Sequence, residues 1–163
     1  MQATTHDPGG SGRQTAYGHT GPTGQGGLGE VGGRCRDASI SDNVRTYAMV
    51  QHGVGFLGAL DVSGLLVAIV TFVLWKIRAH ESPFIDDHGR EATNFQLSLL
   101  IYSTVLIIIS IPLAFITIGL WIPVAGLLGI GIFVLRIIGG IRALIFTGQR
   151  CYYRYPMCLR LIR

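Results

Sequence analysis

The sequence predicts an all-α integral membrane protein with four helical segments, two short and two long, that follow a disordered N-terminal tail. The first observation is a stretch of 44 residues, 92–135, without a charged side chain. A bilayer core of about 30 Å takes roughly 20 helical residues to cross, so this stretch must cross twice. Residues 118–123 turn the chain around, since Gly119 suits the position after a helix and Pro123 suits the first turn of the next.

The second observation is the uneven composition of the chain. Hydrophobic residues make up 49% of the sequence and charged residues 13%, although 11 of the first 33 residues are glycine. A glycine-rich segment buries too little apolar surface to offset the entropy of ordering it. We therefore divide the chain into a disordered Gly-rich tail, residues 1–42, and a helical membrane domain, residues 43–163.

The formal net charge of +4 is compatible with binding to nucleic acid or to an anionic membrane surface. The basic residues lie next to apolar segments, around Lys76 and Arg78 and again from Arg142 to Arg163. No recognition motif accompanies them, so we expect the lipid bilayer as a partner and no nucleic acid. We also expect no cofactor, because the sequence contains no phosphate-binding loop, nucleophile elbow or paired-cysteine site.

The first apolar region, residues 44–77, is interrupted by Asp61. One interpretation is a single span that ends at Trp75, which places Asp61 near the bilayer centre at a cost of about 2.5–3.5 kcal/mol. The other is two short helices, residues 42–60 and 62–77, which fold back on each other and leave Asp61 near the far surface.

Membrane orientation favours the two-helix interpretation. The hairpin of residues 92–135 returns to its starting side, so the basic residues before and after it share one face, which the positive-inside tendency makes cytoplasmic. Two helices keep the three arginines within residues 34–45 on that face as well. We therefore expect a multi-pass protein of the bacterial plasma membrane with both termini cytoplasmic and with Trp75 and Trp121 near opposite interfaces.

The densest polar sequence lies between the two apolar regions, from Ser82 to Gln96. We expect Asp86 or Asp87 to cap a helix that begins near His88, since carboxylates suit the positive end of a helix dipole. Polar side chains then extend one to two turns into the membrane end of this helix. The candidate functional residues of the whole chain are Asp61, Asp86, His88, Glu91, Asn94, Gln96, Arg136, Tyr153 and Arg154.

The last long helix is expected from about Pro123 to Phe146, with glycines spaced so that neighbouring helices can approach closely. Arg136 lies about 16 Å inside the cytoplasmic end of this helix. An arginine within the membrane is a functional candidate, and it can also tie helices together. The side chains that Arg136 could reach are Asp61, Asn94, Gln96 and Tyr102.

The segment after the last helix alternates aromatic, basic and apolar residues from Arg150 to Arg163. This pattern is typical of a segment that lies on an anionic membrane surface. We expect that location for it.

Two motifs carry a resemblance to a known family. The first runs from Glu81 to Gln96, and the second is Tyr153-Arg154-Tyr155-Pro156 followed by residues 159–162. With two long spans between these motifs, the chain resembles small bacterial membrane proteins of unknown function that are grouped with the Tic-twenty-like superfamily. The resemblance covers residues 47–163. It implies a four-helix membrane fold and assigns no reaction.

Two hypotheses about function follow. The first is a non-enzymatic interaction, assembly or translocation-related component, with other membrane proteins or further copies of itself as partners. The second is an ion- or proton-handling protein, or a metal-dependent enzyme, that uses Asp86, His88 and Glu91 together with Arg136. We favour the first, because three residues on one helix end do not complete a coordination sphere, and we expect neither catalytic nor metal-binding residues.

Overall fold

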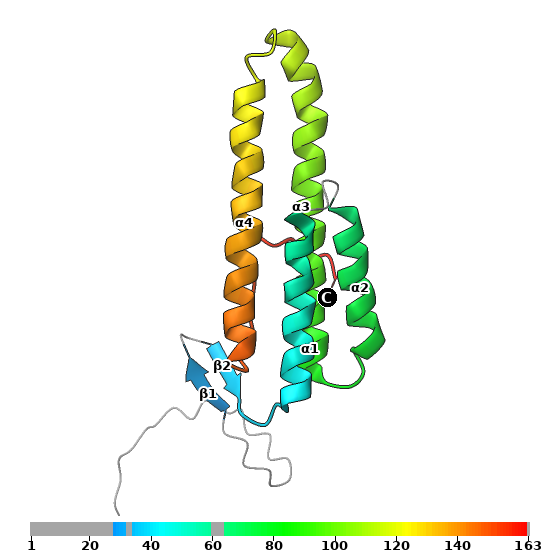
Figure 1. The fold of residues 1–163 in the computed structure, drawn as a ribbon, viewed down its shortest axis with the longest axis vertical. Coiled ribbons are helices and arrows are strands. Elements are labelled where there is room, and N and C mark those ends of the chain that lie inside the picture. The colour runs from blue at the N-terminus through cyan, green and yellow to red at the C-terminus, as the bar shows by residue number, and fades with distance from the viewer. Residues whose placement is uncertain (1–27, 32–33, 60–63, 163) are drawn as a thin grey trace, which may run out of the picture.

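Helices α3 (Pro83–Ile116) and α4 (Ile122–Gly148) form an antiparallel hairpin that runs the length of the molecule (Figure 1). The computed structural model describes residues 28–31, 34–59 and 64–162. In the turn between the helices Gly119 has a φ of 85°, a left-handed conformation that favours glycine. Both helices are long and apolar enough to cross a membrane, and few residues of their most apolar stretches are buried. These features confirm the predicted all-α membrane fold.

The first apolar region forms two short helices. Helix α1 (Asp42–Gly53) continues into the 3-10 helix η1 (Val54–Ala59), and helix α2 (Leu65–Arg78) runs in the opposite direction beside it (Figure 1). The two-helix interpretation is therefore confirmed, and the single span is wrong. Asp61 belongs to the connection between η1 and α2 and lies outside the described residues.

Helix α3 begins earlier than the sequence analysis predicts. Ser82 is extended, and its side-chain oxygen accepts a hydrogen bond from the N–H of Phe84 at 3.2 Å. Pro83 then occupies the first turn. Backbone N–H groups there have no acceptor within the helix, so the lack of an N–H in proline costs no hydrogen bond. The prediction of a start near His88 with Asp86 or Asp87 as the cap is wrong, because Ser82 and Pro83 already form a complete helix start.

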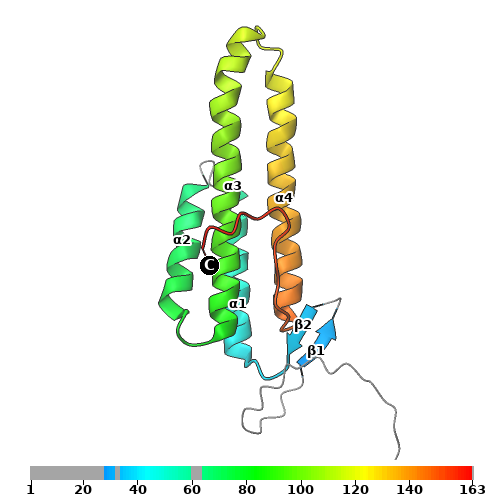
Figure 2. The same ribbon diagram turned by 180° about the vertical axis from the view of Figure 1, so that it is seen from behind.

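The core lies in the half of the molecule where α1 and α2 flank the long hairpin (Figures 1 and 2). An added Cβ on Gly139 would lie 2.9 Å from the ring of Phe95, and one on Gly140 would lie 2.9 Å from the ring of Phe56. These two glycines therefore let aromatic rings pack directly against the backbone of α4. The main buried cluster consists of Phe95, Leu99, Ala143, Tyr153 and Tyr155.

Residues 151–162, which we call the C-terminal segment, pack against the bundle. Figure 2 shows this segment following α4 away from its end and then crossing to α3. Tyr153 and Tyr155 are buried, and the ring of Tyr155 stacks on that of Phe95 with centroids 3.9 Å apart. The aromatic rings of the segment fill the space that Gly139 leaves beside α4, whereas Met157, Leu159 and Leu161 are exposed. The location of the segment on a membrane surface stays a prediction.

Two short strands precede the helices. Strands β1 (Leu28–Val31) and β2 (Arg34–Asp37) are antiparallel, with Leu28 opposite Asp37. The N–H of Asp37 donates to the carbonyl of Arg150 at 3.0 Å, so β2 also contacts the end of α4. The glycine-rich composition predicts no strands here, and the contact of Asp37 with Arg150, more than 100 positions away, leaves no local signal. The domain boundary at residue 42 stays a prediction.

Candidate functional site

Polar side chains on one side of α3 hold the C-terminal segment. They recur every three or four residues, so they point in the same direction from the helix. We call them the α3 polar face, and they are Asp87, Glu91, Asn94, Ser98 and Tyr102. Each of them hydrogen-bonds or ion-pairs with residues 154–162.

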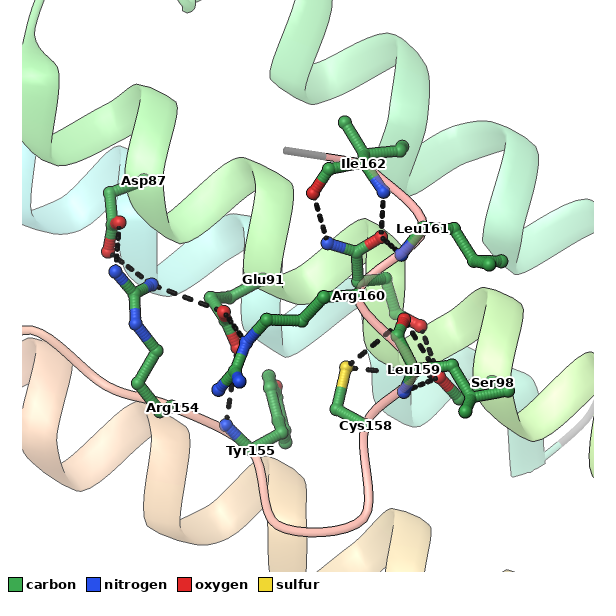
Figure 3. A network of polar contacts seen from close by, with 11 residues as sticks. Asp87, Glu91, Ser98, Arg154, Tyr155, Cys158, Leu159, Arg160, Leu161 and Ile162 are labelled. Carbon is green, nitrogen blue, oxygen red and sulfur yellow. Dashed lines mark hydrogen bonds and ion pairs between the residues drawn. The ribbon is translucent and has the colours of Figure 1, made fainter.

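Two carboxylates of the α3 polar face bind the two arginines of the segment (Figure 3). Asp87 accepts hydrogen bonds from both Nη atoms of Arg154, at 2.9 and 2.6 Å. The side chain of Glu91 is 4% exposed and lies 3.2 Å from Nη1 of Arg154 and 3.1 Å from Nε of Arg160. The backbone N–H of Tyr155 also donates to Glu91, at 3.4 Å. Glu91 therefore joins three points of the segment to α3.

Asn94 binds the backbone near the end of the segment. Its Nδ2 donates to the carbonyl of Ile162 at 2.8 Å. Its Oδ1 accepts from the N–H groups of Leu161 and Ile162, at 3.1 and 2.8 Å. One amide side chain thus satisfies three backbone groups, in the way that a neighbouring strand would.

Ser98 and Tyr102 bind the backbone where the segment turns. The hydroxyl of Ser98 accepts from the N–H of Leu159 at 2.8 Å, and the hydroxyl of Tyr102 donates to the carbonyl of Met157 at 2.8 Å. Because Asn94, Ser98 and Tyr102 all contact main-chain atoms, they fix the path of the segment whatever side chains it carries.

Two buried histidines link α1, α3 and α4 to the segment. Nδ1 of His52 lies 2.9 Å from the hydroxyl of Tyr155, and Nε2 of His52 lies 2.8 Å from Nδ1 of His88. The hydroxyl of Thr147 lies 3.3 Å from the same nitrogen of His88. If the hydroxyl of Tyr155 donates to His52, then His52 donates from Nε2 to His88. One set of neutral tautomers therefore accounts for the bonds from Tyr155 through His52 to His88, and it leaves the proton of His88 on Nε2.

The residues of the predicted cation cluster contact different neighbours. Asp86 accepts from Nε1 of Trp75 at 2.8 Å and from Nη2 of Arg90 at 2.6 Å. His88 faces α1 and α4, whereas Glu91 faces the C-terminal segment. Within residues 28–31, 34–59 and 64–162, no three His, Cys, Asp or Glu side chains gather so that they could hold a metal ion.

Gln96 and Arg136 face the end of the short-helix pair. An added Cβ on Gly55 would lie 2.5 Å from Nε2 of Gln96, and one on Gly58 would lie 2.5 Å from Cζ of Arg136. Arg136 is only 8% exposed, although it lies on an apolar helix. The end of η1 therefore covers the guanidinium group.

The partners that the sequence suggests for Arg136 are mostly engaged elsewhere. Asn94 and Tyr102 bind the C-terminal segment. Asp61 lies outside the described residues.

The helical domain matches one protein family over nearly its whole length. Residues 43–162 match the magnetosome magnetite crystal formation protein family, MamF/MmsF. The chain belongs to this family. No curated protein and no solved structure matches it. The match runs from α1 to the end of the C-terminal segment, so this MamF/MmsF domain includes both the bundle and the segment bound to it.

The resemblance to Tic-twenty-like proteins is wrong. Both motifs that carry it, residues 81–96 and 153–162, lie within the match to the MamF/MmsF family. The structure gives a physical reason why the two motifs occur together. The first contains Asp87, Glu91 and Asn94, and the second contains the arginines and backbone groups that these residues bind.

Sequence reasoning misses several members of the site in this MamF/MmsF protein. Asp87 and Arg160 could have been found, because they are opposite charges in the two conspicuous motifs and so suggest that the motifs bind each other. His52, Thr147 and Tyr155 give no such signal, because isolated polar residues on apolar helices do not reveal their partners. Tyr153, a predicted functional residue, belongs to the core, where its ring lies 5.7 Å from that of Phe146.

Electrostatics in the segment follow from these contacts. Partial burial acts to lower the pKa of Arg154, but the hydrogen bonds and negative charge of Asp87, together with Glu91, raise that pKa overall. Burial raises the pKa of Tyr155 well above its usual value, and the neighbouring Tyr153 adds to the effect. Arg154 is therefore a permanent cation, and Tyr155 is a neutral hydrogen-bonding group at physiological pH.

Proposed function

We propose that this protein is a non-enzymatic component of the magnetosome membrane that serves magnetite crystal formation through contacts with other membrane components. The observation that carries the proposal is the family match, which begins at the start of α1 and ends with the bound C-terminal segment. The complete bundle, with its two long apolar helices, is thus the unit shared with the family.

The placement of charge favours an assembly role over direct handling of iron. The carboxylates of α1 and α3 are each paired with an arginine, and these carboxylates are Asp42, Asp86, Asp87 and Glu91. A carboxylate held in such a pair must lose it before it can bind a cation or a mineral surface. The geometry therefore gives less support to the ion-handling or metal-enzyme alternative built on Asp86, His88, Glu91 and Arg136.

Helix α4 offers a surface for contact with another membrane helix. An added Cβ on Gly126, Gly129 or Gly131 would meet no atom within 4 Å. Small residues of this kind let helix backbones approach closely in lipid, where dispersion contacts drive association. The partners of this surface are other membrane proteins or further copies of the chain.

The structure also supports an arrangement with both termini on the cytoplasmic side. Nη2 of Arg150 lies 2.9 Å from Oδ1 of Asp42, so the start of α1 and the end of α4 are at the same end of the molecule. Lys76 and the described arginines other than Arg136 lie toward this end, as the positive-inside tendency requires of a cytoplasmic face. Molecules of this protein that are not in the magnetosome membrane are expected in the bacterial plasma membrane.

The first experiment follows location and crystal growth in a magnetotactic bacterium that lacks the corresponding gene. We expect a fluorescent fusion to co-purify with magnetosome membranes and to restore crystal size, measured by electron microscopy. The variant Glu91→Leu should fail to restore it, while Glu81→Gln, which changes an exposed ion pair, should restore it. Uniform plasma-membrane fluorescence with unchanged crystals in the deletion strain would refute the proposal.

The second experiment separates assembly from metal chemistry. We expect purified protein in detergent to contain no stoichiometric iron by elemental analysis, and the variant His88→Ala to leave that value unchanged. Bound iron that disappears in His88→Ala would support the metal-dependent alternative instead.

A further inference from the structure

The short helices lie beside only one half of the long hairpin. Figures 1 and 2 show α1 and α2 flanking the end of α3 and α4 that is close to the strands, while the other half of the hairpin extends past them. Helix α2 has 14 residues and α3 has 34, or about 21 and 51 Å at 1.5 Å per residue. The molecule is therefore broad at one end and narrow at the other.

Two tryptophans place the molecule in the bilayer. Trp75 on α2 lies beside Gly89 of α3, since an added Cβ there would be 2.7 Å from Cγ of the indole. Trp121 lies at the other end of α3, where its Nε1 donates to the hydroxyl of Ser110 at 3.0 Å. Helix α3 rises about 32 Å from Gly89 to Ser110, the two residues that the indole rings contact. This rise matches a hydrocarbon core of about 30 Å, at whose two interfaces indole rings concentrate.

This placement puts α2 in one leaflet. From Trp75 back to its first residue, Leu65, the helix rises about 15 Å, which is half of a hydrocarbon core of about 30 Å. Nζ of Lys76 lies 4.0 Å from the centroid of the Trp75 ring, so charge and indole mark the same interface. The first residue of α2, Leu65, thus lies near the middle of the membrane.

The outward face of α2 is apolar and continues the exposed apolar surface of α3 and α4. Acyl chains are the partner that fits it, because the surface has the same character and the same height as the surrounding membrane-spanning surface. The exposed apolar residues of α2 are Leu65, Leu66, Ile69, Phe72, Val73 and Ile77.

Arg136 agrees with a hairpin that ends at mid-membrane. It lies about 18 Å from the end of α4 at Gly148, near the centre of the span. The backbone at Gly58 and Gly64 lies against the guanidinium group. Because these two residues have no side chains, the guanidinium group has room beside them. The tip of the short-helix pair therefore covers a charge that lipid would otherwise contact at considerable cost.

We propose that α1, η1 and α2 insert into a single leaflet and make the protein a molecular wedge that favours curved membrane. Four helices occupy the leaflet on the side of the termini, and only α3 and α4 occupy the other. A larger cross-section in one leaflet expands that leaflet relative to its partner, so the protein has a lower free energy where this leaflet is convex. This property is independent of the role in crystal formation.

Depth in the membrane is measured first. Single cysteines at Leu66, Ile69 and Val73 carry a nitroxide label in protein reconstituted into vesicles, and Ile108→Cys on α3 is the reference. We expect all four labels to collide with lipid-soluble oxygen more than with an aqueous nickel chelate. Access of the chelate to the α2 sites would make α2 a water-exposed helix. Protection from both reagents would mean that a second copy or another protein covers it. Either result overturns the proposal.

Curvature preference is then measured on membrane tubes pulled from giant vesicles that contain the labelled protein. We expect enrichment in the tube for molecules whose termini face outward, and depletion for molecules of the opposite orientation, which are identified by quenching the label from outside. The variant Ile69→Ala/Phe72→Ala should reduce the enrichment, whereas the matched Ile107→Ala/Ile108→Ala in the other leaflet should raise it. Equal density on tube and vesicle in both orientations would refute the wedge.

Discussion

Asn94 and Ile162 form a closed pair of hydrogen bonds. Nδ2 of Asn94 donates to the carbonyl of Ile162, and Oδ1 of Asn94 accepts from the N–H of Ile162, both at 2.8 Å. A side chain of α3 therefore takes the place of a partner strand for the end of the chain. This relationship makes the C-terminal segment a part of the bundle.

Replacing Asn94 by leucine should release the end of the segment. The change removes three hydrogen bonds to backbone groups and leaves the side-chain volume similar, so we expect a loss of about 1–3 kcal/mol in the free energy of unfolding. Hydrogen exchange in detergent micelles measures the effect directly, because the amides of Leu161 and Ile162 should exchange much faster. Unchanged protection of these two amides would show that Asn94 does not hold the segment.

Neutralising Glu91 should weaken the protein more than neutralising an exposed carboxylate. Glu91→Gln leaves Arg154 and Arg160 without one of their negative partners, and we expect the protein to lose about 1–3 kcal/mol of stability. Glu81→Gln affects an exposed pair with Arg78, which solvent screens, so it should lower the stability much less. Thermal unfolding of the two variants in the same detergent gives the comparison. Equal losses would contradict a central role for Glu91.

A methyl group at Gly89 should push α2 away from α3. The added Cβ would lie 2.7 and 2.8 Å from Cγ and Cβ of Trp75, atoms close to the backbone that cannot swing aside, so Gly89→Ala should cost about 1–3 kcal/mol. Gly126→Ala is the matched control on α4, because its Cβ meets nothing within 4 Å and alanine favours the helix. Equal melting temperatures for the two variants would show that Trp75 does not pack on Gly89.

The helices were predictable because their signals are local. A charge-free run longer than one bilayer crossing, with Gly119 and Pro123 in its middle, predicts the hairpin without any tertiary information. The strands and the path of the C-terminal segment were not predictable in this way. Asp37 pairs with Arg150, and Tyr155 stacks on Phe95, and both contacts depend on where the helices bring distant residues.

The candidate site was half predictable for the same reason. The sequence indicates that His88, Glu91 and Asn94 are unusual on a membrane helix, but it does not reveal which way each of them points. Successive helical residues differ by about 100°, so His88 faces α1 while Asn94 faces the segment. Residues that are close in the sequence thus belong to separate hydrogen-bond networks. The cation-binding hypothesis required the side chains of Asp86, His88 and Glu91 to point toward one site.

The pH dependence of labelling at Cys158 should show whether the C-terminal segment is bound to α3. Burial raises the pKa of the Cys158 thiol, against an opposing hydrogen bond from Ser98, so less thiolate is present at a given pH than at an ordinary cysteine. With the other cysteines replaced, we expect maleimide to label Cys158 more slowly at pH 8 than an introduced Ser39→Cys, which is exposed. The rate at Cys158 should still rise at a pH where that of the reference has levelled off, because only the thiolate reacts. Asn94→Leu should remove most of the difference by freeing the segment, and equal rates in the unaltered segment would mean that Cys158 is not held against α3.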